Sequence, residues 1–323
     1  MPIPDHLKEV VSNLPPAPGV YKFYDEKERL LYIGKSKNLK NRVRSYFRKQ
    51  NDETQERTLM MIFHINEIKI ERTETELEAL ILEDSMIKQH LPPYNVKQKK
   101  FREQVYISLT SDEYPVINVI PNDKVDLFSK IFGPFKDKYA AEFIISTILR
   151  VLRLRSCTDP TPKDKCMLAG IGKCLGPCQN NISSQEYNEV MRVAIELLEG
   201  KSKQFSEKIQ KQIKNAVQCL DFEAAAQLRD INKFCLNFCV RQEFTLNILK
   251  KDTIIYGKKN TFLFWNCSLL KVYKNKMTIE QIRRYFKKTK NSGNKENIHH
   301  LIDRAYVVWV WVKQNQAKYE FLD

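Results

Sequence analysis

Two tyrosines, Tyr21 and Tyr32, are the first side chains in this sequence whose spacing suggests chemistry. Each belongs to a glycine-containing tripeptide, Gly19-Val20-Tyr21 or Tyr32-Ile33-Gly34. Apolar and polar residues alternate around both, which predicts a strand, a turn and a return strand. Paired antiparallel strands would bring the two phenols together, and a phenol acts as a base at neutral pH only if its pKa is lowered. The second glycine is expected to allow a tight backbone turn into the helix cap Asn38.

An arginine, a third tyrosine and an isolated acid follow on predicted helices. Arg42 and Tyr46 are four residues apart on a helix predicted over Asn38–Arg48, so they share one face. Farther on, Thr73-Glu74-Thr75-Glu76 predicts the start of a helix that carries Glu83 among apolar residues. An acid on such a helix needs a partner or a metal ion, because burying an unpaired carboxylate is costly.

Pro93-Tyr94-Asn95-Val96 completes a set of elements that residues 14–98 share with GIY-YIG nucleases. That family uses two tyrosines, a helix arginine, a helix glutamate and a terminal asparagine in this order, and Val20 replaces the isoleucine of its first motif. The spellings LPPAPGVY, YIGKSKNLKNRVRSYF, EALILEDSMIK and PPYNV resemble the amino-terminal domain of UvrC, the nuclease subunit of bacterial nucleotide excision repair. The resemblance covers roughly residues 10 to 239.

The resemblance implies an α/β domain with a small, mostly antiparallel sheet, and it implies roles for individual residues. Glu83 would hold one Mg²⁺ or Mn²⁺ ion, and Tyr32 would be the general base toward water with Tyr21 hydrogen-bonded beside it. Lys35 and Arg42 would lower the phenol pKa values and hold phosphate oxygens. The remaining roles are orientation of the phosphate by Tyr46 and bracing of the site by Asn95. The implied catalytic set is Tyr21, Tyr32, Lys35, Arg42, Tyr46, Glu83 and Asn95.

Four cysteines form the spaced group Cys157-x8-Cys166-x7-Cys174-x3-Cys178. Glycines and a proline lie between them and permit tight turns around an ion or cluster. Four thiolates serve Zn²⁺ or an iron–sulfur cluster equally well by ligand type, and four ordinary buried thiols are the alternative. The resemblance to UvrC favours a [4Fe–4S] cluster, with zinc as second choice.

Three further segments are expected after the first domain. Residues 99–200 form an α+β region that includes the cysteines, and residues 201–240 form a helical hairpin. LDFEAAAQLRDINKF in the hairpin resembles the UVR motif, which in UvrC pairs with UvrB; an intramolecular hairpin is the alternative. Residues 241–323 are expected to be a small α+β tail of three strands and a closing helix. No acidic metal site is recognisable there among Asp252, Glu280, Glu296 and Asp303, so a second nuclease is expected to be absent or vestigial.

The composition indicates a polyanionic partner and a cytoplasmic protein. The net charge is +15, and no apolar run approaches the length of a membrane span. Neither a signal peptide nor a membrane partner is expected. Seven Lys or Arg residues and no acid lie between Lys35 and Lys49, directly after the second tripeptide, which favours phosphate contacts over a merely solvated helix face. A second basic stretch, Lys271 to Lys290, is equally consistent with nucleic-acid binding and with a solvated surface.

The sequence therefore favours a metal-dependent DNA endonuclease of nucleotide excision repair. It would cut damaged double-stranded DNA 3′ to the lesion, acting with UvrA and UvrB, and would resemble the short UvrC homologue Cho in length. One alternative is a catalytically idle adaptor that binds DNA and UvrB. A third reading is a GIY-YIG nuclease of a mobile element, against which the cysteine group and the hairpin argue.

Overall fold

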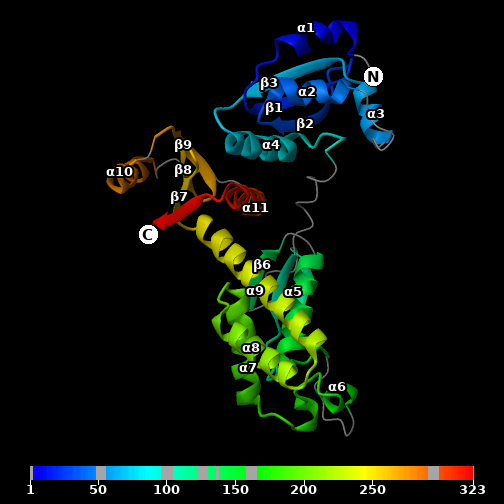
Figure 1. Ribbon diagram of the computed structural model, residues 1–323, viewed down its shortest axis with the longest axis vertical. Coiled ribbons are helices and arrows are strands. Elements are labelled where there is room, and N and C mark those ends of the chain that lie inside the picture. The colour runs from blue at the N-terminus through cyan, green and yellow to red at the C-terminus, as the bar shows by residue number, and fades with distance from the viewer. Residues whose placement is uncertain are drawn as a thin grey trace. The chain divides into compact units, whose positions relative to one another are not determined.

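The chain packs into two compact units (Figure 1). The computed structural model describes residues 3–48, 56–95, 105–121, 130–135, 138–157, 166–275, 277–289 and 298–322. The first unit combines Met1–Arg102 with Ile248–Asp323, and the second is Glu103–Asn247. Some residues of the predicted motifs and basic stretches lie outside the described residues: Lys49, Val96, Lys276, Lys290 and Glu296.

The amino-terminal part of the first unit is a three-stranded antiparallel sheet, in the order β2-β1-β3, with helices around it. The predicted small antiparallel α/β domain is confirmed, whereas its first and third helices were not predicted. The elements are α1 (Asp5–Asn13), β1 (Gly19–Tyr24), β2 (Leu30–Ser36), α2 (Leu39–Phe47), α3 (Glu56–Phe63), β3 (Glu67–Arg72) and α4 (Glu76–His90).

Short polar side chains set the boundaries of these elements. In the β1–β2 turn, Asp25 Oδ1 accepts hydrogen bonds from the backbone N–H groups of Lys27 and Arg29, each at 2.9 Å. Asn38 caps α2 by accepting a hydrogen bond from the Asn41 N–H at 3.0 Å. Strand β2 therefore leads directly into α2, the helix that carries Arg42 and Tyr46.

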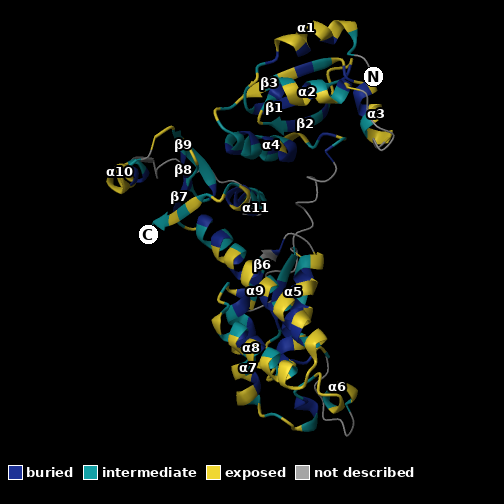
Figure 2. Ribbon diagram, in the orientation of Figure 1, coloured by how far each residue is buried: buried dark blue, intermediate teal, exposed yellow. Residues whose placement is uncertain are grey.

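Helix α4 is unusual because it has no solvent-facing side along most of its length. Thr75 caps it by accepting a hydrogen bond from the Glu78 N–H at 3.2 Å. Every residue from 75 to 88 is buried or partly buried (Figure 2). Besides its charged residues, the helix carries apolar residues such as Leu77, Ile81 and Leu82 on several faces, and such a helix is expected to be covered on several sides. This explains why Glu83 has apolar neighbours.

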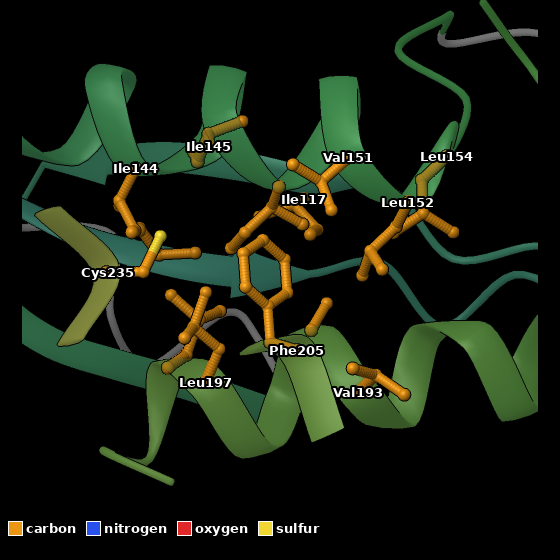
Figure 3. Packing of buried hydrophobic residues seen from close by; sticks show 14 of the residues in the cluster. Ile117, Ile144, Ile145, Val151, Leu152, Leu154, Val193, Leu197, Phe205 and Cys235 are labelled. Atoms are coloured by element: carbon orange, nitrogen blue, oxygen red, sulfur yellow. The ribbon is translucent and has the colours of Figure 1, made fainter. Parts of the chain in front are cut away.

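The second unit packs helices on a three-stranded antiparallel sheet of order β5-β4-β6. Its core is shown in Figure 3, where Phe205 lies between Val151 and Leu152 on one side and Leu197 on the other. The elements are β4 (Val105–Leu109), β5 (Ile117–Pro121), β6 (Lys130–Phe135), α5 (Lys138–Leu152), α6 (Met167–Gly170), the 3-10 helix η3 (Pro177–Gln179), α7 (Ser184–Leu198), α8 (Lys203–Gln218) and α9 (Phe222–Ile248).

Helices α8 and α9 are joined by a short turn at Cys219–Asp221, where the sequence predicted a break. The hydroxyl of Ser206 on α8 donates a hydrogen bond to Asn232 Oδ1 on α9 at 2.9 Å. Phe205 and Cys235 bury their side chains in the core of the second unit. One side of this helix pair is therefore packed within its own unit.

The carboxy-terminal part of the first unit is a four-stranded antiparallel sheet of order β10-β7-β8-β9 with two helices. The three predicted strands and the closing helix are present. Helix α10 was not predicted, although Ile282 and Phe286 are buried on it and Ile279, Ile282 and Phe286 follow a helical spacing among basic residues. The elements are β7 (Asp252–Tyr256), β8 (Thr261–Trp265), β9 (Ser268–Tyr273), α10 (Ile279–Thr289), α11 (Ile298–Asn315) and β10 (Lys318–Leu322).

Within the part of the chain that the structure describes, no helix combines the length and apolar character needed to cross a membrane.

Candidate active site

Three phenols from three different elements gather on one face of the sheet. Tyr21 comes from β1, Tyr32 from β2 and Tyr46 from α2. Their ring centroids are 5.9 to 6.4 Å apart, and the hydroxyls of Tyr21 and Tyr46 are 2.8 Å apart, a hydrogen bond. Phe23 packs against Tyr21 and Tyr46 at 5.1 and 5.2 Å between centroids. The predicted proximity of Tyr21 and Tyr32 is therefore present, and Tyr46 joins them.

The register of β1 and β2 explains this arrangement. Phe23 is directly opposite Tyr32, and Tyr21 is directly opposite Gly34. Side chains two residues apart on a strand share a face, so all four positions point the same way. Because Gly34 has no side chain, the Tyr21 ring can lie across its Cα.

Gly34 is thus not the turn residue that the sequence suggested. It lies inside strand β2, which continues to Ser36. A Cβ atom at this position would overlap the hydroxyl and Cζ atoms of Tyr21 and lie 2.8 Å from Cε1 of Tyr32. Glycine is required here by the approach of the two phenols, and only the strand register reveals this.

Arg42 binds the phenol cluster from helix α2. Its Nε donates to Tyr21 Oη at 3.3 Å, and its Nη2 donates to Tyr46 Oη at 3.4 Å. The guanidinium carbon is 5.1 Å from the centroid of the Tyr46 ring. Arg42 is nevertheless solvent-exposed, so its other donor groups face outward and can reach a phosphate.

Burial has the largest effect on the pKa values of Tyr21 and Tyr32. The pKa of Tyr21 is raised well above its ordinary value by burial, followed by the neighbouring Tyr46 and Tyr32. The pKa of Tyr32 is also raised, first by burial, then by Tyr46, and by the carboxylate of Glu83. Arg42 lowers both values, but by less than burial raises them. Among these side chains, burial therefore outweighs the charge of Arg42.

Lys35 contributes its backbone to the site, and its side chain points elsewhere. Its ammonium group is 3.5 Å from Glu76 Oε1, and Lys37 lies 2.9 Å from Glu76 Oε2. The Lys35 backbone N–H donates a hydrogen bond to Glu83 Oε1 at 3.1 Å. Sequence reasoning missed Glu76, whose place in the first turn of α4 is an ordinary one for a stabilising acid.

Glu83 is the acid of the site, and its side chain is 7% exposed. It raises the pKa of Tyr32, so the carboxylate lies close to that phenol. Among the described residues, no group of three or more His, Cys, Asp or Glu side chains is arranged to hold a metal ion. Mg²⁺ is commonly bound by one or two carboxylates together with water and substrate phosphate. One buried carboxylate close to Tyr32 fits that kind of site and not an all-protein cage.

Asn95 fastens the outer edge of β2, the edge strand of the sheet. Its Oδ1 accepts a hydrogen bond from the Ile33 N–H at 2.9 Å, and its Nδ2 donates to the Ile33 carbonyl at 2.8 Å. The backbone N–H of Tyr94 also donates to the Leu31 carbonyl at 3.1 Å. Ile33 stands between Tyr32 and Gly34, so the amide immobilises the strand between these two site residues.

The four spaced cysteines belong to the second unit. Burial raises the pKa of the Cys178 thiol, as do its hydrogen bond and charge interaction with Cys166. Burial also raises the pKa of Cys174, which interacts with Cys157 and Cys166. The backbone N–H of Gly176 donates to Cys174 Sγ at 3.4 Å. The thiols are neighbours, although among the described residues no three of them are arranged to hold a single metal ion.

Comparisons with known proteins agree on one relationship. Residues 17–96 match the family described as UvrC-like GIY-YIG domain, and residues 104–197 match the family described as UvrC/Cho excinuclease, middle domain.

Two similar curated proteins are both named UvrABC system protein C. The protein from Acetivibrio thermocellus is 34% identical over 262 residues, and the one from Carboxydothermus hydrogenoformans is 38% identical over 257 residues. The alignments cover 79% and 78% of this chain and 42% of each relative, so the chain spans less than half of their length. The solved GIY-YIG N-terminal endonuclease domain of UvrC from Thermotoga maritima, bound to magnesium, is 33% identical, with 29% of this chain and 99% of that chain covered and a TM-score of 0.26.

Proposed function

Because the chain belongs to the UvrC family, we propose that it is a metal-dependent DNA endonuclease that cuts 3′ to a lesion in nucleotide excision repair. One observation carries the proposal. Three phenols and one exposed guanidinium form a hydrogen-bonded cluster beside a buried carboxylate. Phosphodiester hydrolysis needs groups that hold the phosphate, move a proton and support a cation, and this cluster offers all three kinds.

In this proposal each residue acts from the position described above. Arg42 binds a non-bridging phosphate oxygen through N–H groups that do not contact the phenols. Tyr46 orients the phosphate beside it. Tyr32, ionised to the phenolate, accepts the proton of the attacking water. Glu83 holds the Mg²⁺ or Mn²⁺ ion, which when bound would stabilise negative charge at phosphorus and lower the pKa of the nearby phenol. Asn95 keeps β2 in place during these steps.

DNA contacts are proposed on two basic surfaces. One is the Arg42 side of α2, and the other is α10 with the neighbouring strand β9. Lys271, Arg283, Arg284 and Lys287 are exposed there, and within the described part of the chain none of the four forms an ion pair. Tyr273 and Tyr285 pack edge to face between them, 6.1 Å apart. Unpaired cations beside aromatic rings are suited to a nucleic-acid backbone.

The exposed turn between α8 and α9 supports docking to a UvrB-like partner. Val217, Leu220 and Phe222 are 44%, 74% and 60% exposed at this turn. Three large apolar side chains at one end of a helix pair are costly in water unless a partner covers them. We propose that UvrB, acting with UvrA, binds here.

Only the 3′ incision is proposed for the residues of this chain. Asp252 lies on β7, Glu280 on α10, and Asp303 lies 3.6 Å from Lys88. Among the described residues these acids do not converge on a common point. Glu296 lies outside the described residues. A two-metal nuclease site needs several convergent carboxylates.

A labelled duplex with one adduct tests this function. We expect incision 3′ to the adduct that requires a divalent cation, UvrA and UvrB. Chelation of the cation should stop the incision. Deleting residues 203–239 should prevent UvrB from loading the chain onto the duplex, and the incision should be lost with it. A reproducible 5′ incision that disappears on Asp252→Asn or Asp303→Asn substitution would contradict the assignment. A chain that binds the duplex and never cuts it would be the idle adaptor.

The cysteine group is proposed to hold a [4Fe–4S] cluster with a structural role. Protein purified without oxygen should be brown and contain four irons per chain, the count of such a cluster. Cys174→Ser should remove the iron and lower the melting temperature of the second unit, because the cluster would cross-link its loops. Cys219→Ser, at an exposed cysteine outside the group, is the control. Colourless protein with one zinc per chain would show that the group holds zinc and not iron. Folded protein with neither metal would exclude both assignments.

A further inference from the structure

Helix α4 carries Glu83 on one side and a second set of buried polar contacts on another. One side packs on β1 and β2, where Ile87 meets Val20 and Ile33. Another side packs on α11, in the carboxy-terminal part of the same unit. The nuclease-like domain and residues 248–323 are therefore joined through the helix that carries the candidate metal ligand.

Lys88 is buried where α4 meets α11. Its side chain is 4% exposed, and its ammonium group donates to Asp84 Oδ2 at 2.8 Å on the same helix. The same group donates to the His300 carbonyl at 3.1 Å and lies 3.6 Å from Asp303 Oδ2 on α11. An ammonium group held this way has lost its water, and its partners come from both helices. Burial also raises the pKa of Asp84, which Lys88 opposes.

Arg304 makes the reciprocal contact from α11. The residue is 4% exposed. Its Nη2 donates to the Ser85 hydroxyl of α4 at 3.0 Å, and its Nη1 lies 3.4 Å from the Ser268 hydroxyl of β9. Arg304 thus connects α4 with both α11 and the carboxy-terminal sheet. Directed hydrogen bonds to buried charges specify one relative position of two helices, whereas apolar contacts alone allow several.

These contacts begin at the residue next to Glu83. Asp84 and Ser85 directly follow it in the sequence, and Lys88 lies little more than one helical turn farther on. The Glu83 carboxylate is held on the other side of α4 by the Lys35 N–H. Because a helix moves as a rigid body, a displacement at the α11 contact shifts Glu83 relative to the phenols.

We propose that residues 248–323 position the candidate metal ligand: α11 binds α4 through Lys88 and Arg304 and so holds Glu83 beside the phenol cluster. Lys88 and Arg304 are positioning residues, since neither is among the site residues. The inference rests on the proposed function, because Glu83 is a metal ligand only under that proposal. Supporting residues of a metal ligand commonly change metal affinity by about 10–100-fold when they are replaced.

Arg304→Met and Lys88→Met in the full chain test the proposal, because methionine keeps an unbranched aliphatic stem and removes the charged group that makes the contacts. The first measurement is Mn²⁺ binding by electron paramagnetic resonance, with Mn²⁺ alone as the probe. We expect the dissociation constant to rise about tenfold or more. The second measurement is nicking as a function of Mn²⁺ concentration, where the midpoint should shift by a similar factor and the rate at saturation should fall less.

Lys274→Met is the matched control. Lys274 pairs with Glu74 at 3.4 Å between the same two parts of the chain, but both side chains are largely exposed. An exposed ion pair contributes little, so its loss should leave Mn²⁺ binding unchanged. Ser85→Ala, which removes one hydroxyl from the Arg304 contact, is the milder variant if Arg304→Met does not fold. It should weaken Mn²⁺ binding in the same direction.

Tryptophan fluorescence reports whether α11 stays on α4. All three tryptophans, Trp265, Trp309 and Trp311, lie in the carboxy-terminal part. Unchanged Mn²⁺ affinity in folded Arg304→Met, Lys88→Met and Ser85→Ala proteins would overturn the proposal, whether or not the emission shifts. A wild-type chain that binds Mn²⁺ and does not nick contradicts the proposed function instead, and the binding measurements still decide the positioning role.

Discussion

Glu83→Gln should reduce nicking of a lesion-bearing duplex by about 10²–10³-fold, the usual cost of losing one group that stabilises transition-state charge. The amide keeps the size of the side chain and one oxygen that can accept the Lys35 N–H, now at 3.1 Å from Glu83. It removes the negative charge that a divalent cation requires. The fold and the DNA affinity should therefore remain close to those of the wild type.

The measurement is single-turnover nicking together with DNA binding and Mn²⁺ binding on the same preparations. Glu71→Gln is the control, because Glu71 is a partly exposed acid of the same domain that pairs with Lys22 at 3.5 Å. It should nick at the wild-type rate. Wild-type nicking by Glu83→Gln protein free of contaminating nuclease would show that the proposed metal role is wrong.

Gly34→Ala should lower the nicking rate more than the addition of one methyl group suggests. The new methyl group would overlap the hydroxyl and Cζ atoms of Tyr21 and approach the Tyr32 ring. Tyr21 must then move, which breaks its hydrogen bonds with Tyr46 and Arg42. A displacement of about 1 Å can cost on the order of 10²-fold in rate. Overpacking of this kind typically destabilises a protein by about 1–3 kcal/mol, so the chain should still fold.

Nicking rate and melting temperature measured together check this prediction. The control is Gly170→Ala, because a Cβ atom at Gly170 would meet no other atom within 4 Å. That variant should keep both the melting temperature and the nicking rate. A Gly34→Ala protein that cuts within about threefold of the wild type would mean that the Tyr21 position does not matter for catalysis.

Much of the first domain could be predicted because its signals are local. Alternation of apolar residues indicated β1 and β2, and the cap residues Asn38 and Thr75 mark the helix starts that the structure has. The spacing of Arg42 and Tyr46 is a property of a single helix. Helix α10 was not predicted, although Ile279, Ile282 and Phe286 follow a helical spacing, because the stretch was interpreted from its basic residues.

What the sequence determined by itself was the inventory of the site: three tyrosines, an arginine, a buried acid and an asparagine, with the element that carries each. These follow from residue type and short-range periodicity, which are read along the chain. The tertiary structure alone decided why Gly34 is glycine, why the phenol pKa values rise and how Asn95 fastens Ile33 from 62 residues away. It also decided that α11 covers the helix of Glu83. Strand register, burial and contacts between distant segments arise only when the chain packs, because desolvation and steric overlap depend on neighbours in space.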